Sequence, residues 1–550
     1  MDFEDTNTES RLPPGTTRLE DLVGDTVFLK PSPTSDPNDP LNWSPHRKAV
    51  QTTLLSFYTT FVFASLTVGI PNWELMNADL GVSYDNLSNG FAVNLAALAI
   101  GCWLVVPLAL RYGRRPVYLG TAFVLFASNV WQSCIQSTGE YFGSQFLCGI
   151  AGAINETLFQ VTITDLFFVH QRGSIQGLYL ICVTIGNYLA PVATGYVGAS
   201  QGWRWSYRYC AIFIGIIALL MTVFLEETAY APALEGLPTQ QPLPQTSHPA
   251  PGADTKKDVA TATDNEPADV PDTSVQPAHT RRAIPINHSI PLKSRRQRLA
   301  LITPSPHPGH SIRQHYAQPL SILFTLPAIT FTALQYGISI ATLSILATTT
   351  SLLYPLPPYH FSTIGIGNMN IPPLIGSILG ALYGGPLVDR FILFAAKRWN
   401  QGVYEPEMRL CMYPLPALAL PAGVLLYGLA LAHGRSWVVS AVGAGLVGFG
   451  VGGVGDISLT YALDAYTDVI GDAFVAVAAV RNLLAMVLVF VLPRWLQGMG
   501  TGRAFGLLGG LIALLVLTCV PMVVWGRELR RRSAGRYRDF AAKQYGARRG

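Results

Sequence analysis

Between two long apolar segments, the chain reads Pro107-Leu108-Ala109-Leu110-Arg111-Tyr112-Gly113-Arg114-Arg115-Pro116. After an apolar segment in its second half, it reads Gly385-Pro386-Leu387-Val388-Asp389-Arg390, a shorter stretch of similar pattern. A tight, basic turn that contains glycine lets two membrane helices approach closely on one side of a bilayer. Because such a turn occurs once in each half, the sequence predicts a chain built from two similar halves.

The composition of the chain is that of a protein in a lipid bilayer. Its 550 residues are 50% hydrophobic and only 13% charged, whereas a soluble protein carries about 25% charged residues. So few charges could not cover the surface of a protein of this length in water. The composition therefore excludes a soluble protein and predicts an integral membrane protein.

Hydrophobic runs divide the chain further. A helix needs about 20 mostly apolar residues to cross the hydrocarbon core. By this criterion we predict twelve transmembrane helices, at residues 49–70, 89–110, 116–134, 141–164, 177–198, 207–225, 319–350, 363–388, 411–432, 437–462, 471–493 and 503–526. The predicted fold class is all-α integral membrane, with the twelve helices arranged in two six-helix bundles.

The positions of lysine and arginine orient these helices. Most of the 37 basic residues fall in connections on the same side as the N-terminus, which is the pattern of cytosolic segments. The pattern predicts that both termini are cytosolic. The connection 463–470 is an exception, because it carries Asp464 and Asp468 and no basic residue.

Composition also predicts the domain boundaries. We expect a polar cytosolic tail at 1–48, an N-terminal six-helix bundle at 49–225, a C-terminal bundle at 319–526 and a basic cytosolic tail at 527–550. The segment 226–318 joins the bundles. Its central part is rich in Pro, Thr, Ala and Asp and lacks aromatic residues, so it cannot bury enough apolar surface to fold. We expect it to be a disordered cytosolic linker.

Both glycine-containing turns resemble the G-x-L-x-D-R-x-G-R-R signature of the major facilitator superfamily. The resemblance implies a transporter and assigns cytosolic gating to Arg111, Gly113, Arg114, Arg115, Asp389 and Arg390. In that family the acidic residue of the signature is thought to lie against a helix N-terminus of the other half and to favour one access state. Leu110 replaces this acid in the first half, so Asp389 is the expected latch. Simple positive-inside anchoring is the alternative interpretation of the basic cluster.

A second motif lies in the fifth predicted span, which reads Gly186-Asn187-Tyr188-Leu189-Ala190-Pro191-Val192-Ala193-Thr194-Gly195. It resembles the antiporter motif g-x-x-x-G-P-x-x-G-G of the superfamily, with Ala190 and Thr194 in place of two glycines. Pro191 frees a carbonyl and bends the helix, while Gly186 and Gly195 allow close packing. We expect a bend at these three residues, although a generic kinked helix would have a similar sequence.

Five further stretches resemble the fungal drug:proton antiporter branch of the superfamily. They read Asp36-Pro37-Asn38-Asp39-Pro40-Leu41-Asn42-Trp43-Ser44, Asp165-Leu166-Phe167-Phe168-Val169-His170-Gln171-Arg172-Gly173, Gly202-Trp203-Arg204-Trp205, Glu226-Glu227-Thr228 and Tyr404-Glu405-Pro406-Glu407-Met408-Arg409-Leu410. The resemblance covers residues 36 to about 500 and implies a fungal source and proton-coupled transport of small organic compounds. Gln145 departs from the branch, which usually has an arginine at this position in span four.

Three ionisable residues fall inside predicted spans: Glu156 in span four, Asp456 in span ten and Arg481 in span eleven. A charge at mid-membrane costs about 2.5–3.5 kcal/mol on insertion scales, so each is expected to face a cavity or a partner. In the superfamily, spans one, four, seven and ten line the central cavity. The resemblance therefore places Glu156 and Asp456 on opposite walls, as groups that bind protons or a cationic amine. Arg481 is the expected partner of Asp456, and a structural ion pair is the alternative for all three.

Polar and aromatic residues on the lining spans are further candidates for the substrate site. They are Tyr58 on span one, Gln335 and Tyr336 on span seven, and Tyr461 on span ten. Aromatic residues in spans more often face lipid or the helix core, so ordinary packing competes with a binding role.

An enzyme would need a clustered catalytic set. The ten histidines are scattered, the seven cysteines show no CxxC spacing, and no nucleotide-binding fingerprint is present. We therefore expect no enzymatic activity, no cofactor, no metal site and no nucleic-acid partner. Energy for transport would come from an ion gradient, and protons are the expected ion.

Two directions of transport remain open. Proton-coupled efflux of drugs, toxins or secondary metabolites fits the motif in span five. Proton-coupled uptake of a cationic amine, polyamine or other nutrient fits the carboxylates in the membrane. A nutrient-sensing receptor on a transporter scaffold is a third interpretation. The expected partners are a small-molecule substrate, protons and the lipid bilayer. The expected state is a monomer in the plasma membrane, with the vacuolar membrane as the alternative.

Overall fold

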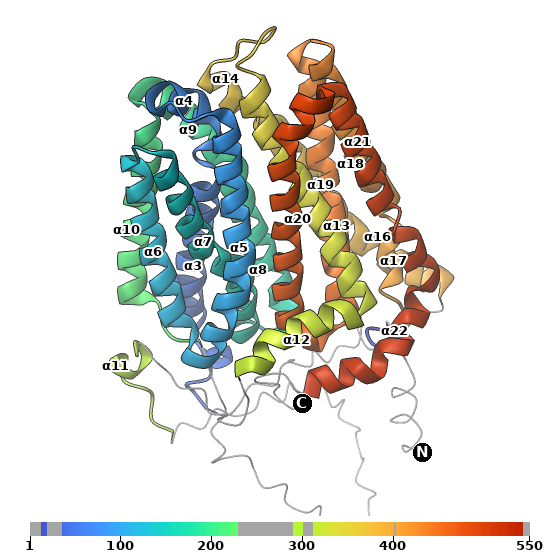
Figure 1. The fold of residues 1–550 in the computed structure, drawn as a ribbon. Helices are drawn as coiled ribbons and strands as arrows, with labels where there is room; N and C mark the ends of the chain where they lie inside the picture. Colours follow the sequence, from blue (N-terminus) through green and yellow to red (C-terminus); the bar gives the residue numbers. More distant parts are fainter. Residues whose placement is uncertain (1–12, 19–35, 229–289, 301–311, 401–402, 543–550) are drawn as a thin grey trace, which may run out of the picture.

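The computed structural model describes residues 13–18, 36–228, 290–300, 312–400 and 403–542. Helices dominate it and stand side by side in two groups (Figure 1), the N-terminal group in blue to green and the C-terminal group in yellow to red. The last described helix, α22, and the strand β1 lie at the end of the molecule that also carries α12 (Figure 1). We call this the inner end and the opposite one the outer end.

The N-terminal half follows the predicted order of spans. Its long helices are α3 (Pro45–Thr67), α5 (Tyr84–Tyr112), α6 (Arg114–Cys134), α7 (Thr138–Leu166), the broken span α8–η3–α9 (Val169–Thr184, Ile185–Leu189 and Ala190–Gln201) and α10 (Trp203–Phe224). Shorter elements flank them: η1 (Pro40–Asn42) precedes α3, while η2 (Ile70–Asn72) and α4 (Trp73–Leu80) follow it at the outer end.

The C-terminal half has a similar plan. Its elements are α12 (Ile312–Thr325), α13 (Pro327–Leu353), the broken span α14–α15–η4–α16 (Thr363–Asn368, Ile371–Leu382, Tyr383–Leu387 and Val388–Trp399), α17 (Glu407–Leu410), α18 (Pro414–Ala432), α19 (Trp437–Ala465), η5 (Thr467–Val469), α20 (Ile470–Met499), α21 (Thr501–Val516) and α22 (Cys519–Ala542). The short helix α11 (Arg295–Arg298) precedes them, and β1 (Thr17–Arg18) pairs antiparallel with β2 (Val403–Tyr404).

Within the described residues, eleven helical stretches are long and apolar enough to cross a membrane. The predicted third span, α6, has 21 residues but carries the polar cluster Ser128, Asn129, Gln132 and Ser133. These side chains are buried, because α6 packs against α7 and α10. The Asn129 amide, for example, donates to Ser65 Oγ of α3 at 3.2 Å. With α6 included, the predicted twelve-helix architecture is confirmed.

Several predicted spans have different ends in the structure; span eight, for example, continues to Trp399 instead of ending at 388, and span eleven continues to Met499 instead of ending at 493. Span seven begins at Pro327 rather than 319, since Leu326 is extended and proline is favoured at the first turn of a helix. The preceding residues form the separate helix α12, which lies across the inner end (Figure 1). Span twelve continues through α22 to Ala542 instead of ending at 526. Most of the predicted linker, 229–289 and 301–311, lies outside the described residues.

Small residues allow close packing in the C-terminal half. The backbone of Gly376 on α15 lies against Gly445 and Phe449 of α19, and Gly448 of α19 lies against Pro373 of α15. In a membrane, such close backbone approach drives helix association, because lipid offers no hydrophobic effect between helices. Large apolar side chains such as Leu418, 70% exposed, instead cover the outside of the bundle, as expected for a surface in lipid.

We predict that Gly376→Val destabilises the protein. A Cβ at this position would meet the Gly445 carbonyl oxygen and would lie 2.8 Å from the Phe449 amide nitrogen, and such overpacking costs about 1–3 kcal/mol. The melting temperature of the detergent-purified protein should fall. Gly510→Val is the matched control, since a Cβ there meets nothing within 4 Å. Equal melting temperatures for the two variants would contradict the packing account.

Candidate functional site

The central polar feature of the molecule is an ion pair between its two halves. Glu156 on α7 pairs with Arg481 on α20, and both residues are only 7% exposed. Asn482 Nδ2 donates to Glu156 Oε2 at 2.7 Å, and the Cys102 thiol of α5 lies 3.6 Å from the same oxygen. A buried guanidinium stays charged, so its partner must be ionised for the pair to form.

Aromatic rings surround this ion pair. The Arg481 guanidinium carbon lies 5.0 Å from the centroid of the Tyr336 ring on α13, a favourable arrangement for a cation. On the N-terminal side, Phe159 of α7 stacks on Tyr179 of α8 with ring centroids 4.7 Å apart. The predicted candidates Glu156, Arg481 and Tyr336 are therefore brought together.

Asp456 occupies a different place from the one expected. The prediction that Arg481 pairs with Asp456 is wrong, because the guanidinium turns toward Glu156 of the other half. The half-buried Asp456 carboxylate faces the π-helical turn η4, and Oδ2 would lie 3.1 Å from a Cβ on Gly384. Two adjacent glycines at 384 and 385 leave room for the carboxylate beside the span-eight backbone.

The remaining cavity candidates are fully buried within their own halves. Tyr58 donates to Thr121 Oγ1 at 3.3 Å. Gln335 donates to the Leu515 carbonyl and to Thr518 Oγ1, each at 2.7 Å, and accepts from the Tyr413 hydroxyl at 2.6 Å. Tyr461 lies near the inner end, 3.4 Å from Glu407 Oε1. These contacts favour a packing role for all three candidates.

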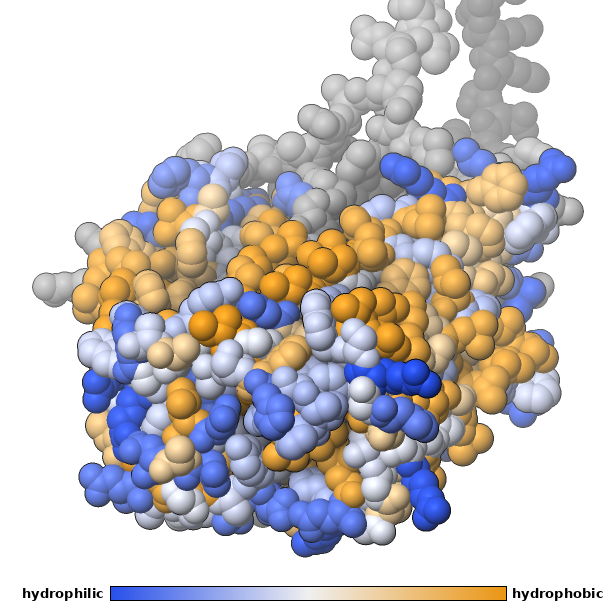
Figure 2. Space-filling view, turned by 90° about the horizontal axis from the view of Figure 1, so that it is seen from above, coloured by the Kyte–Doolittle hydropathy of each residue, from blue (hydrophilic) through white to orange (hydrophobic). Residues whose placement is uncertain are grey.

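The outer ends of the two halves are in direct contact. A Cβ on Gly195 of α9 would lie 2.7 Å from the Thr363 carbonyl oxygen and 3.3 Å from Gly367 Cα of α14. The Ser351 hydroxyl of α13 donates to the Ile70 carbonyl at 2.7 Å. Figure 2, which looks onto the outer end, shows a continuous surface of mixed polar and apolar side chains. The two halves are therefore closed against each other at the outer end.

The predicted bend in span five takes part in this closure. The π-helical turn η3 ends two residues before Pro191 and contains Gly186, whose backbone lies against Thr60 and Phe63 of α3. The Tyr188 hydroxyl in the same turn shares a 2.7 Å hydrogen bond with Ser377 of α15. Span five thus contacts the other half both at mid-depth and at its outer end.

The first basic turn closes the inner end of the N-terminal half. Gly113 has a positive φ of 106°, and the amides of Arg114 and Arg115 that follow it donate to the Glu227 carboxylate at 2.9 and 3.0 Å. A carboxylate is favourable at a helix N-terminus, because it meets free amides and the positive end of the helix dipole. Arg114 also pairs with Asp165 at 3.1 Å.

The other basic residues of this turn have different surroundings. Arg115 is buried and donates to the carbonyls of Thr222 and Leu225 at 2.7 Å each. Arg111 is exposed, 5.5 Å from the Tyr112 ring centroid.

The second turn belongs to a cluster of charges at the inner end of the C-terminal half. Arg409 Nη1 donates to Asp389 at 2.7 Å, and Arg409 Nε donates to Asp464 at 2.5 Å. The Tyr404 hydroxyl also donates to Asp464. Burial opposes the charge of Arg409, but Asp464, Tyr404 and Asp389 together outweigh it and raise the pKa of Arg409 above its ordinary value. Arg390 is exposed on α16.

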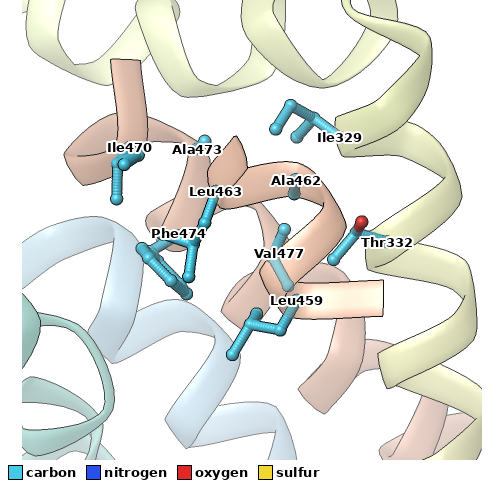
Figure 3. Close-up of a pocket in the computed structure, with 9 residues that line it drawn as sticks. All are labelled: Ile329, Thr332, Leu459, Ala462, Leu463, Ile470, Ala473, Phe474 and Val477. Atoms are coloured by element: carbon cyan, nitrogen blue, oxygen red, sulfur yellow. The ribbon is translucent and has the colours of Figure 1, made fainter. Parts of the chain in front are cut away.

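A small, open apolar hollow lies between α13, α19 and α20 (Figure 3). Eight of its nine lining residues are apolar, and Leu459, Leu463 and Phe474 project to one side of it (Figure 3). The ninth, Thr332, donates its hydroxyl to the Ser458 carbonyl at 2.8 Å. This lining would suit an apolar group and carries no charge.

Several contributors to the site were not predicted. Tyr179, Cys102 and Asn482 gather around Glu156, yet each is an ordinary residue of an apolar span in the sequence. Of these three residues, only Asn482 could have been selected from the sequence, because it directly follows Arg481. Glu227 and Arg409 belong to stretches that resemble the family, but their roles depend on contacts far away along the chain.

The comparisons with known proteins agree with this architecture. Residues 52–489 match the model of the Major Facilitator Superfamily. An uncharacterised MFS-type transporter of Schizosaccharomyces pombe is 33% identical over 530 residues, which cover 94% of this chain and 90% of that protein. Protein HOL1 of Saccharomyces cerevisiae is 28% identical, with coverage of 92% and 90%. The solved structure of the human organic anion transporter MFSD10 has a TM-score of 0.54 at 16% identity, covers 87% of this chain and 100% of that one, and indicates the fold alone.

We predict that removing the charge of Glu156 and removing the charge of Arg481 destabilise the protein by unequal amounts. Glu156→Gln strands a guanidinium in a buried site, and breaking a buried ion pair in this way costs about 3–5 kcal/mol. Arg481→Gln should cost less, because the remaining glutamate can bind a proton. The double variant Glu156→Gln/Arg481→Gln carries neither charge and should melt above Glu156→Gln. If the double variant melts at or below Glu156→Gln, Arg481 does not depend on this partner.

Proposed function

The chain belongs to the Major Facilitator Superfamily, and we propose that it exports small organic compounds in exchange for protons by alternating access. The observation that carries this proposal is the ion pair between Glu156 and Arg481. It is buried and joins one helix of each half. Any movement that separates α7 from α20 must first neutralise or replace it.

Protonation of Glu156 is the least costly way to release the pair. An isolated charge in a buried site costs several kcal/mol, and arginine does not lose its proton in proteins. Glutamate can become neutral, so it is the partner that responds to pH. A proton that reaches Glu156 would weaken its hold on Arg481 and favour separation of the halves.

The direction of transport is supported by span five. Its bend resembles the antiporter motif, and its outer part forms the closed outer end with α14. In our proposal, cargo that enters from the cytosol loosens the ion pair and opens the outer end, a proton from outside then neutralises Glu156, and the cargo leaves as that proton enters. The closed outer end would then represent the state that receives cargo from the cytosol.

Uptake of a cationic amine is the second candidate, and one observation favours it. The Glu156 carboxylate and the Tyr336 ring together hold the organic cation of Arg481. A carboxylate beside an aromatic face is a general way to bind an amine. A substrate amine that displaces Arg481 from this place would couple its own binding to the release of the halves.

We place the transporter as a monomer in the plasma membrane, with the vacuolar membrane as the alternative. Efflux to the medium requires the plasma membrane, whereas sequestration of the same cargo would use the vacuole. The positive-inside pattern is the same for both, so localisation of a tagged chain distinguishes them.

We predict that Glu156→Gln removes the pH dependence of transport. In proteoliposomes with an imposed pH gradient, transport driven by that gradient should fall by at least about tenfold, which corresponds to about 1.4 kcal/mol. Exchange of labelled for unlabelled cargo needs no net proton movement and should persist. Glu74→Gln, an exposed carboxylate at the outer end, is the control. An unchanged rate and pH profile in Glu156→Gln would reject Glu156 as the coupling residue.

The direction of transport is tested by comparing small molecules in cells and medium with and without this gene. Efflux predicts compounds that accumulate inside the deletion strain, or new sensitivity to a toxin that the cell makes. Uptake predicts amines that remain unconsumed in the medium. The second result would replace our first proposal with the second candidate.

A further inference from the structure

Residues 13–18 precede the first span, yet the contacts that the structure gives them lie on the C-terminal half. The strand β1 pairs antiparallel with β2, with Thr17 opposite Tyr404 and Arg18 opposite Val403. The strand β2 lies between spans eight and nine. The N-terminal tail therefore reaches from the chain segment before α3 to the inner end of the other half.

Gly15 allows the tail to pack closely against the C-terminal half. Gly15 has a φ of 82°, a conformation that glycine adopts without strain. A Cβ at Gly15 would collide with the Asp464 carbonyl oxygen and would lie 2.9 Å from Ala465 Cα. The backbone of the tail thus packs directly on the inner end of α19, where no larger residue fits.

A buried arginine holds the tail from a third element. Arg530 of α22 is 1% exposed and donates to Glu407 through Nε at 2.8 Å and Nη2 at 2.6 Å. Its remaining nitrogen, Nη1, donates to the Pro14 carbonyl and lies 3.3 Å from Thr16 Oγ1. Because Arg530 is shared, the tail completes the hydrogen bonds of an internal ion pair.

The surface on which the tail packs also carries the charged cluster of Arg409, Asp389 and Asp464 at the inner end. Asp464, whose backbone contacts Gly15, accepts from Arg409 and Tyr404 through its side chain. Arg409 in turn holds Asp389 of α16. Residues 13–18 consequently touch β2, in the connection between spans eight and nine, and the inner ends of spans ten and twelve through α19 and α22.

We propose that residues 13–18 form an N-terminal strap that holds these inner ends in the arrangement that accompanies a closed outer end. A segment that binds one conformation better than another shifts the population toward it. Docking of the strap favours the outer-closed state, and its release favours outer opening. The strap thereby regulates the rate of the transport cycle. This inference rests on the alternating access proposed above, but on neither proton coupling nor the direction of transport.

The first measurement asks whether the strap docks. In a background with the exposed cysteines Cys134 and Cys411 replaced by serine, Arg18→Cys and Val403→Cys should form a disulfide in the full chain, because these residues are Cα partners. Adding Gly15→Val should reduce the disulfide yield strongly. If the parent pair does not cross-link, the strap is not docked and the proposal is wrong.

The second measurement asks whether docking controls the outer end. Tyr196 and Asn368 form a hydrogen bond across the outer junction at 3.3 Å, so Tyr196→Cys/Asn368→Cys treated with a short bifunctional thiol cross-linker reports outer closure. We expect Gly15→Val to slow this cross-link by at least about threefold. A synthetic peptide with the sequence of residues 13–18, added in trans, should restore it, whereas the same peptide carrying Gly15→Val should not.

A chain that lacks residues 1–18 serves as a second variant with the same expected behaviour. If strap release leaves the outer cross-link unchanged in both variants, the strap has no control function. These readouts need no substrate and no pH gradient. An unchanged pH profile in Glu156→Gln would therefore reject proton coupling and leave the strap proposal standing. A failed cross-linking test would reject the strap proposal alone.

Discussion

A charged pair buried in a bilayer constrains every helix around it. Glu156 and Arg481 are each too costly to bury alone, so the two halves of the chain must meet where these residues lie. This requirement sets the rotation of α7 and α20 about their axes and places Tyr336 and Asn482 beside the pair. The two halves are thus joined at mid-depth by a charged contact and not by apolar packing alone.

Different kinds of contact hold the helices together at three depths of the molecule. The outer end is closed by backbone-to-backbone packing at Gly195. The middle is held by the ion pair between Glu156 and Arg481. The inner end carries Arg409 with Asp389 and Asp464, at a place where water screens charge more strongly. Each depth therefore relies on a different kind of contact.

The sequence predicted the fold better than it predicted the pairing of side chains. Apolar length located most spans, because the bilayer sets that length whatever the neighbours are. It failed at α12, where Pro327 separates two helices that form one apolar run in the sequence. Glu156 and Arg481 were identified as candidates because charge is rare in spans, but their partnership depends on helix rotation. Gln335 was predicted to line the cavity, because the sequence does not show that three neighbouring residues satisfy the hydrogen-bonding groups of its side chain.

The π-helical turns of spans five and eight, η3 and η4, have a consequence for the evolution of this chain. Such a turn holds one residue more than an α-helix would use over the same length. Deleting that residue from η3 would restore a regular helix and leave the residues beyond it in nearly the same rotation, whereas a deletion from the regular helix between Ala190 and Thr194 would rotate everything beyond it by about 100°. Gly195 would then turn away from Thr363, and a side chain would take its place in the junction. Single-residue deletions are therefore expected to be tolerated better in η3 than in the regular helix that follows it, while Gly186 and Tyr188 remain constrained by their contacts with α3 and α15.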